Sequence, residues 1–344
     1  LFRSLVAMPL SVAVIDSGIG GLPYLTAARN ALPRGSFVYA ADTAHFPYGE
    51  KSEEEIRDAV VTMVERLRRH VAPAAVVVAC NTASVVVLEE LRGIFDIPFV
   101  GVVPAVKPAA ATSRAHRIGV LATPRTAGGA YLQALIERFA ANAEVVVEAA
   151  PDLVAFIENR MLQAGASERR DALERSVRRL IDARVDRIVL GCTHFIHLRR
   201  EIEELLGPAI GVVDSVDGVT RQLLRVLGRR PPDSAAVDDE TGGRGDAAEG
   251  REAATEDRLY VTAADRAPAH YAEWARRAGL RYAGELPAAG RGSGGDATAG
   301  PTAAATNDAT TSPTAASTDD ATNGATSDAT AGASGAGRAD SEAV

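Results

Sequence analysis

The chain has 344 residues, of which 47% are apolar and 5% aromatic, and its formal net charge is −8. This length allows two domains of ordinary size, and the negative charge argues against a nucleic-acid partner, because phosphate binding requires clustered Lys and Arg. No run approaches the ~20 apolar residues that cross a bilayer, and two cysteines are too few for a disulfide framework, so we expect a cytoplasmic protein with reduced thiols and no membrane segment.

Short β-branched strands alternate along the chain with longer amphipathic helices. Strands are predicted at residues 12–15, 37–41, 75–79, 98–102, 117–122, 144–148, 187–190, 210–213 and 259–262. Helical patterns occupy residues 52–70, 126–141, 167–183 and 215–227. Ser52 followed by Glu55 has the spacing of a capping box. Apolar strands alternating with helices predict an α/β fold of parallel sheets covered on both faces, in which ligands bind at the carboxyl ends of the strands.

Three segments stand apart from this pattern. The first residues lead directly into Asp16 without a small-residue cleavage site, so we expect no signal peptide, and Met8 is a candidate start. Residues 231–257, rich in Pro, Asp, Glu and Gly, predict a solvated insertion. Residues 285–344 contain almost no large apolar side chain, so we expect a disordered C-terminal tail.

Both cysteines end predicted strands in similar contexts, VVVACNT at residues 76–82 and IVLGCTH at residues 188–194. A thiol placed there faces the beginning of the next helix, whose dipole stabilises a thiolate. A buried cysteine is often an inert small hydrophobe, but two in matching polar contexts favour a reactive pair. The polar residues that follow them are Asn81, Thr82, Thr193 and His194. We interpret His194 as an acid/base assistant of Cys192, with a core histidine as the alternative.

Two further polar loops follow strands. In DSGIGG at residues 16–21 the third glycine of a dinucleotide fingerprint is missing, so we expect a tight turn that offers Asp16 and Ser17 to a small polar ligand. The alternative is a structural turn in which Asp16 caps the next helix. In the loop of residues 42–49, the backbone of Gly49 and the side chain of Tyr48 could bind a carboxylate, and Asp42 could orient a base.

The composition argues against two common cofactors. Pyridoxal phosphate requires a Schiff-base lysine, and the chain offers only Lys51 and Lys107, without a phosphate-binding loop. A structural zinc site requires about four clustered ligands, which a single Cys-x-His pattern does not supply. We therefore expect neither a cofactor nor a metal.

Together these segments resemble the glutamate racemase family of the aspartate/glutamate racemase superfamily. The matching stretches are residues 16–22, 42–49, 79–84, 101–105 and 190–194, in family order. The resemblance implies two pseudo-symmetric parallel-sheet α/β domains with the active site between them. On this basis we expect a first domain of residues 8–98 and 210–284 and a second domain of residues 99–209.

The resemblance also implies cofactor-independent racemisation of L-glutamate and D-glutamate, with Cys80 and Cys192 as the two bases and D-glutamate supplied to peptidoglycan synthesis. It implies Asp42, His194 and Glu158 as catalytic assistants. The substrate contacts that it implies are Asp16, Ser17, Tyr48, Gly49, Asn81, Thr82, Thr193 and His194, with Thr123 and Thr126 as further candidates.

Three alternatives stay open. An aspartate racemase or a related isomerase would use the same chemistry on another substrate. A thiol hydrolase would use Cys192 as nucleophile beside His194, but it leaves Cys80 without a role. A non-catalytic protein would bind the same small molecule without turnover. The sequence does not determine the oligomeric state, and a homodimer is one of the arrangements that we consider.

Overall fold

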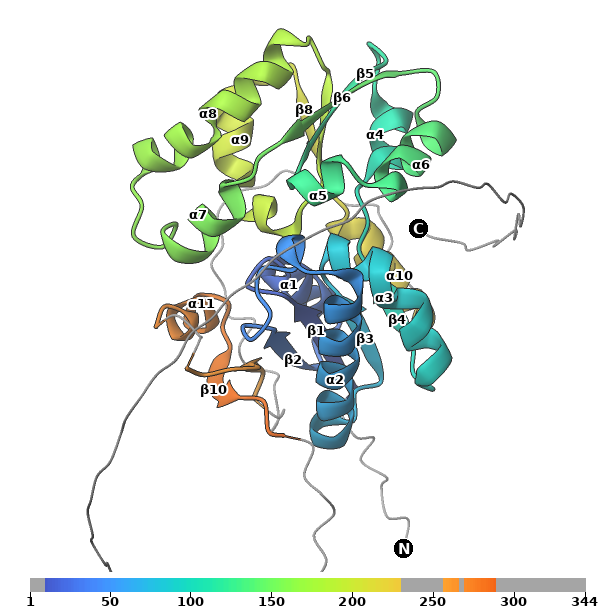
Figure 1. The fold of residues 1–344 in the computed structure, drawn as a ribbon, viewed down its shortest axis with the longest axis vertical. Helices are drawn as coiled ribbons and strands as arrows, with labels where there is room; N and C mark the ends of the chain where they lie inside the picture. The colour runs from blue at the N-terminus through green and yellow to red at the C-terminus, as the bar shows by residue number, and fades with distance from the viewer. Residues whose placement is uncertain (1–9, 230–255, 266–268, 289–344) are drawn as a thin grey trace, which may run out of the picture. The chain divides into compact units, whose positions relative to one another are not determined.

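Two parallel β-sheets form the framework of the chain (Figure 1). The computed structural model describes residues 10–229, 256–265 and 269–288. The strand order is β10-β9-β2-β1-β3-β4 in the first sheet and β6-β5-β7-β8 in the second. All pairings among these strands are parallel. The predicted α/β class with two parallel sheets is therefore confirmed.

The strands of the first sheet are β1 (Ser11–Asp16), β2 (Ser36–Ala41), β3 (Ala75–Val78), β4 (Phe99–Gly101), β9 (Arg258–Val261) and β10 (Arg281–Glu285). Those of the second sheet are β5 (Arg117–Ala122), β6 (Glu144–Ala149), β7 (Arg187–Leu190) and β8 (Gly211–Val213). All predicted strand positions are occupied by strands, and β10 is an additional one.

Helices cover both faces of the first sheet. Val12 and Val14 of β1 belong to a core shared with α1 (Leu22–Ala31), α10 (Val216–Val226) and α11 (Tyr271–Arg277). The alternate residues Ala13 and Ile15 pack in a second core, because successive side chains of a strand point to opposite faces. The helices of that second core are α2 (Glu53–Val71) and α3 (Asn81–Ile94). We call the first sheet with these helices the first lobe.

The second sheet is covered in the same way, and we call it with its helices the second lobe. Val120 of β5 packs with α4 (Val106–Thr112) and α6 (Ala130–Phe139). On the other face, Leu121 and Leu190 share a core with α7 (Leu153–Asn159), α8 (Ala166–Asp182) and α9 (Arg199–Leu206). This core is continuous with the α1 side of the first lobe, so the two lobes are packed together through apolar side chains.

Local signals fixed the ends of several helices. The capping box at the start of α2 is confirmed: Ser52 Oγ accepts from Glu55 N at 3.2 Å, and Ser52 N donates to Glu55 Oε2 at 2.8 Å. The helix predicted over residues 126–141 is instead two helices, because α5 (Pro124–Ala127) ends at Gly128 and α6 begins after Gly129. Glycine weakens a helix interior by roughly 1 kcal/mol relative to alanine, and two in succession divide it.

The sheet pairing shifts both expected domain boundaries. β4, expected in the second domain, pairs with β3 of the first sheet. β8, expected in the first domain, pairs with β7 of the second sheet. The chain thus crosses between lobes after β4 and after β8. A strand's apolar pattern reports that it is buried, but its neighbour is decided by the path of the connecting segment, which the pattern does not encode.

The expected insertion and tail lie outside the described residues, except at their edges. Asp257, at the end of the insertion, is buried and accepts from Phe37 N at 2.8 Å. Glu285 belongs to β10, and Leu286 is fully buried. The ordered first lobe therefore continues a few residues past the expected boundary at residue 284.

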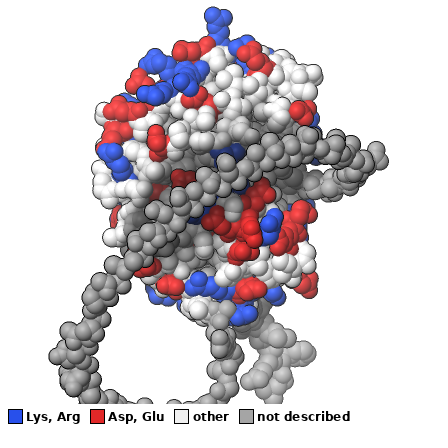
Figure 2. Space-filling model, in the orientation of Figure 1, with Lys and Arg blue, Asp and Glu red and all other residues white. Residues whose placement is uncertain are grey.

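The surface of the described residues is notable for acidic side chains (Figure 2) and shows no sign of a membrane-spanning helix. No helix there is long and apolar enough to span a bilayer. Acidic side chains gather on the visible face over α2 and α3 (Figure 2), where Glu53, Glu54 and Glu55 open α2. Negative charge in the first turn stabilises a helix through its dipole, and it makes this face unfavourable for a polyanion.

Candidate active site

Both cysteines lie at the carboxyl ends of interior strands and directly precede a helix. Cys80 follows β3 and is the N-cap of α3, and Cys192 follows β7 and is the N-cap of the 3₁₀ helix η2 (Thr193–Leu198). Their backbones are alike, with φ −138° and ψ 122° for Cys80 and φ −140° and ψ 136° for Cys192. Both thiols are buried and free. The sequence echo between the two segments therefore corresponds to a repeated strand–cysteine–helix turn, one in each lobe.

A cavity of about 230 Å³ contains both thiols. Pockets for drug-sized ligands measure ~300–1,000 Å³, so this one suits a smaller molecule. Predicted site residues that line it are Ser17, Tyr48, Gly49, Cys80, Asn81, Thr82, Thr123, Thr126, Cys192, Thr193 and His194. Asp16, Asp42 and Glu158 are buried behind this lining. The predicted residues that line the cavity thus come from five separate segments of the sequence.

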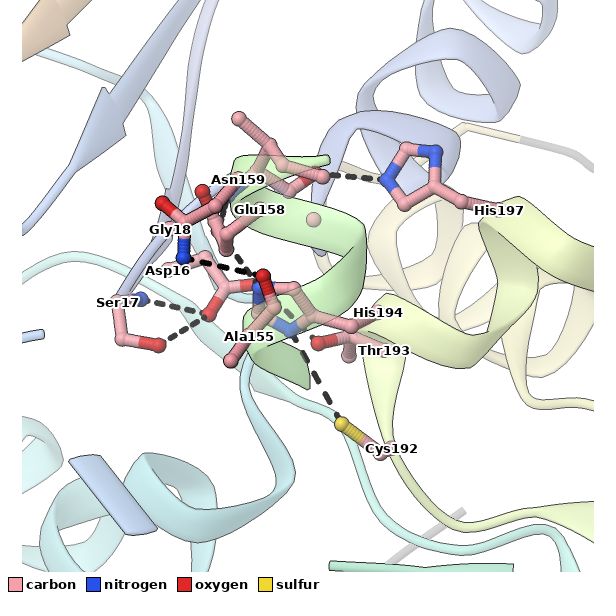
Figure 3. Close-up of polar contacts among 12 residues, drawn as sticks. Asp16, Ser17, Gly18, Ala155, Glu158, Asn159, Cys192, Thr193, His194 and His197 are labelled. Carbon is pink, nitrogen blue, oxygen red and sulfur yellow. Dashed lines mark hydrogen bonds and ion pairs between the residues drawn. The ribbon is translucent and has the colours of Figure 1, made fainter. Parts of the chain in front are cut away.

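On the second-lobe side, Cys192 is the first member of a chain of polar contacts (Figure 3). Nδ1 of His194 lies 3.9 Å from Sγ of Cys192, and Nε2 of His194 lies 2.7 Å from Oε1 of Glu158. His194 and Glu158 are both buried, at 3% exposure each. Glu158 is contributed by α7, a separate helix of the same lobe. Glu158 and His194, both expected as catalytic assistants, are therefore joined by a direct hydrogen bond.

The electrostatics of this pair favour a charged imidazolium next to a carboxylate. Burial alone would lower the pKa of His194, but hydrogen bonding to Cys192 and Glu158 raises that pKa well above its usual value. Burial alone would raise the pKa of Glu158, but the hydrogen bond from His194 and other donors lowers it. The ring that carries this positive charge lies 3.9 Å from Sγ of Cys192, measured at Nδ1.

The surroundings of Cys80 disfavour its thiolate form. Burial raises the pKa of the Cys80 thiol well above its usual value, and the negative charge of Asp16 adds to this effect. Backbone N–H groups of Thr82 and Ala83, at the beginning of α3, act in the other direction but do not outweigh burial. The two thiols therefore line one cavity in unlike surroundings, with the His194–Glu158 pair beside Cys192 and the carboxyl group of Asp16 acting on Cys80.

Asp16 joins the two lobes beside the cavity. Its Oδ1 accepts from the backbone N–H of Ser17 at 2.6 Å, and its Oδ2 accepts from Thr193 Oγ1 at 3.1 Å. Burial raises the pKa of Asp16 from 3.8 to about 6. Asp16 is thus a buried acid held by residues of both lobes, rather than the N-cap of α1, which is Gly21.

Asp42 contacts the cavity through Tyr48. Tyr48 OH donates to Asp42 Oδ2 at 2.6 Å, and Thr262 Oγ1 donates to Asp42 Oδ1 at 2.5 Å. The ring of His45 lies 3.0 Å from the same carboxylate. Asp42 therefore fixes the ring of Tyr48, which lines the cavity with Cys80.

Glycines of the first loop permit the lobes to approach closely. A Cβ atom at Gly18 would lie 1.7 Å from Oε1 of Glu158, and one at Gly20 would lie 2.5 Å from both Nδ1 of His194 and Oγ1 of Thr193. Contacts under 3.0 Å are essentially never made by real Cβ atoms. This loop is therefore glycine-rich because its backbone lies against the His194–Glu158 pair.

Sequence reasoning missed several lining residues. They are Phe46, Pro47, Glu50, Pro124, Arg125, Pro151, Val154, Ala155 and Gly191. Arg125 is the notable one, because its Nη1 donates to Lys51 O at 2.6 Å and its Nη2 lies 4.0 Å from Glu53 Oε1, across the two lobes. Its position directly after strand β5 was a usable signal, since strand carboxyl ends carry the site in such folds.

A second omission was Tyr271, whose OH donates to Glu158 Oε2 at 3.0 Å. It belongs to α11, far along the chain from every recognised motif. No local sequence signal marked it.

Within residues 10–229, 256–265 and 269–288, no three His, Cys, Asp or Glu side chains gather as metal ligands would.

The fold and the site define a class: a two-lobed parallel α/β protein with a free thiol at a strand end of each lobe, both in one small cavity. Comparison with known proteins specifies it further. The family model described as Asp/Glu/Hydantoin racemase matches residues 24–223. The chain belongs to this Asp/Glu/Hydantoin racemase family.

Several relatives and solved structures are similar over most of their length. The chain is 40% identical over 276 residues to a glutamate racemase of Treponema pallidum, covering 80% of this chain and 96% of that protein. It is 43% identical over 219 residues to one of Ectopseudomonas mendocina, covering 63% and 82%. The crystal structure of Escherichia coli glutamate racemase in complex with L-glutamate and the activator UDP-MurNAc-ala has a TM-score of 0.69 at 33% identity, covering 82% of this chain and 100% of that one.

Proposed function

We propose that this protein is a glutamate racemase that interconverts L-glutamate and D-glutamate with Cys80 and Cys192 as its two bases. The observation that carries the proposal is the pair of buried free thiols in one cavity, each at the carboxyl end of a strand from a different lobe. Racemisation must remove the Cα proton from one face and return a proton to the other. One thiol on each side of a shared cavity meets this requirement.

In the proposed reaction the thiolate of one cysteine takes the Cα proton, so that a C–H bond breaks and an S–H bond forms. The opposing thiol then donates its proton to the other face of the carbanion and becomes the thiolate. The two cysteines must begin in opposite protonation states. The imidazolium of His194 next to Cys192 and the raised pKa of Cys80 supply this difference. By analogy with the family, Cys192 deprotonates L-glutamate and Cys80 deprotonates D-glutamate.

Substrate groups are assigned by the polar atoms of the cavity. Oδ1 of Asn81 is buried and has no hydrogen-bond partner among the described residues, and buried polar atoms are generally paired. We propose that the substrate ammonium donates to it. Substrate carboxylates would be bound by the hydroxyl and backbone donors of the lining. The hydrogen bonds of Asp42 with Tyr48, Glu158 with His194 and Asp16 with Thr193 would hold these lining side chains in place. The proposed substrate contacts are Ser17, Tyr48, Gly49, Asn81, Thr82, Thr193 and His194.

The burial of Cys80, Cys192 and His194 supports the same chemistry. A small cavity excludes most water, which strengthens interactions between protein dipoles and a developing carbanion.

We propose that the reaction proceeds in the cytoplasm, where thiols stay reduced. D-glutamate produced there would serve peptidoglycan synthesis. Growth of a D-glutamate-requiring bacterium that expresses this chain, but not its Cys192→Ser variant, would support that role.

The decisive experiment is solvent exchange in heavy water. The protein is incubated with either enantiomer of glutamate, with a chelator and without added cofactor. We expect racemisation with deuterium at Cα of the product enantiomer. Turnover of aspartate but not glutamate would retain the chemistry and refute the substrate. Dependence on pyridoxal phosphate, or inhibition by the chelator, would refute the mechanism, and a covalent acyl-enzyme would favour the thiol hydrolase.

A further inference from the structure

The carboxylate of Glu158 is held by donors from three directions. Oε1 lies 2.7 Å from Nε2 of His194 and accepts from Ile19 N at 2.7 Å. Oε2 accepts from Tyr271 OH at 3.0 Å. Two of these donors, Ile19 and Tyr271, belong to the first lobe, whereas Glu158 and His194 belong to the second. Tyr271 is the first residue of α11 and is 2% exposed.

Tyr271 acts on an oxygen that the other two donors do not bind. Oε1 already accepts from His194 and Ile19, so among the described residues Oε2 depends on the Tyr271 hydroxyl for its hydrogen bond. A buried carboxylate oxygen without a partner favours protonation of the acid. A protonated Glu158 would no longer stabilise the positive charge of His194. The Tyr271 hydroxyl therefore has a route to the Cys192 sulfur through two intermediate side chains.

We propose that Tyr271 is a positioning residue for Cys192, acting through Glu158 and His194 to maintain the imidazolium beside the thiolate. This inference rests on the proposed racemase function. Tyr271 does not line the cavity, so it influences the proton transfer rather than the binding of substrate. Because Tyr271 and Glu158 come from different lobes, the charged state of His194 is set only where the lobes are packed together.

Several titratable groups around Glu158 interact with it and therefore influence its pKa. Those with an electrostatic or hydrogen-bond effect on it, or subject to one from it, are Asp16, Tyr39, His194, His197, His270 and Tyr271. Hydrogen bonds from His194, Ile19 and Tyr271 together outweigh burial and lower the pKa of Glu158. Of these three, only the Tyr271 hydroxyl can be removed by deleting a single atom.

The test compares Tyr271→Phe with Tyr24→Phe. Tyr24 is a matched control, because it is equally buried and its OH also makes one side-chain hydrogen bond, of 2.8 Å with Ser215 Oγ. For Tyr271→Phe we expect kcat to fall about tenfold and KM to change less than about twofold, since one net hydrogen bond corresponds to about a tenfold effect. The equilibrium constant between enantiomers is unity, so kcat/KM must fall equally in both directions.

The pH profile separates positioning from simple packing. Without the Tyr271 hydroxyl the pKa of Glu158 rises and that of His194 falls, so the imidazolium is lost at a lower pH. We expect the alkaline limb of the kcat/KM profile to shift to lower pH by about half to one unit. The limb should not move in Tyr24→Phe. An unchanged limb in Tyr271→Phe would overturn the proposal.

Three further experiments test the proposal even if glutamate is not the substrate or Tyr271→Phe does not fold. NMR titration of the His194 ring in ¹⁵N-histidine-labelled protein should give a lower pKa in Tyr271→Phe, even if glutamate is not the substrate. If Tyr271→Phe does not fold, 3-fluorotyrosine at position 271 retains the hydroxyl as a stronger donor and should move the limb upward. In a Glu158→Gln background, Tyr271→Phe should leave the His194 titration unchanged. A further shift there would show that Tyr271 does not act through Glu158.

Discussion

Thr193 Oγ1 donates a hydrogen bond of 3.1 Å to Oδ2 of Asp16. The residue after the second cysteine is thereby joined to the carboxyl group that ends β1 of the other lobe. Asp16 is 1% exposed, and burial raises its pKa from 3.8 to about 6. Ionising this group in the folded protein therefore costs free energy that ionising it in the unfolded chain does not.

The first prediction concerns Asp16→Asn. Because the folded pKa lies above the unfolded one, wild-type stability should fall as the pH rises from about 4 to about 6, by about 3 kcal/mol from this group. Asn cannot ionise, so the free energy of unfolding of Asp16→Asn should increase relative to wild type over this window. Urea unfolding at a series of pH values measures the difference. Asp96→Asn, at an exposed position, is the control, and a pH-independent difference for Asp16→Asn would contradict the prediction.

The second prediction concerns the thiols. Cys80→Ser and Cys192→Ser should each lower racemisation by at least about 10²–10⁴-fold, the typical contribution of a positioned acid or base, because a serine hydroxyl does not supply the required anion. Both variants should remain folded, as circular dichroism can verify. Deuterium exchange at Cα without inversion should persist for one enantiomer in each variant: L-glutamate with Cys80→Ser and D-glutamate with Cys192→Ser. Near-normal racemisation by either variant would eliminate the two-base assignment.

The third prediction concerns Gly20→Ala. The new Cβ would lie 2.5 Å from Nδ1 of His194 and 2.8 Å from Oδ2 of Asp16, so the loop or these two buried side chains must shift. We expect a loss of stability of about 1–3 kcal/mol, as for other overpacked sites, and a fall in kcat. Gly93→Ala is the control, because a Cβ there has nothing within 4 Å and its helical position should make the change neutral or slightly stabilising. Equal stability of the two variants would show that the loop tolerates a side chain.

The fourth prediction concerns Arg125→Gln. Arg125 links α5 of the second lobe to Lys51 O of the first at the cavity, so its loss should weaken the arrangement that encloses the substrate. We expect KM to rise roughly 2–10-fold, the equivalent of one hydrogen bond, with a smaller effect on kcat. Arg138→Gln, at an exposed position of the same lobe, should leave both constants unchanged. A fall in kcat at constant KM would instead assign Arg125 to the chemical step.

Much of the site was predictable because its signals are local. Cys80 and Cys192 each follow an apolar strand and precede a helix, and this order is visible in consecutive residues. The capping box of α2 is likewise contained in four residues. Asp42 was expected to orient a base, and the structure shows which side chain it binds, namely Tyr48. The motif identified the loop, but the direction of a side chain depends on its packing.

Sequence alone determined the alternation of strands and helices, the position of both thiols at strand ends and the glycine-rich turn beside them, because backbone propensity and burial periodicity act over a few residues. Tertiary structure alone decided that β4 and β8 pair within the lobes opposite to those expected. It also brought Tyr271 and Ile19 to the carboxylate of Glu158 and placed Arg125 across the cavity. These contacts join residues distant in the chain, and they form only when the apolar surfaces of whole helices and sheets pack together.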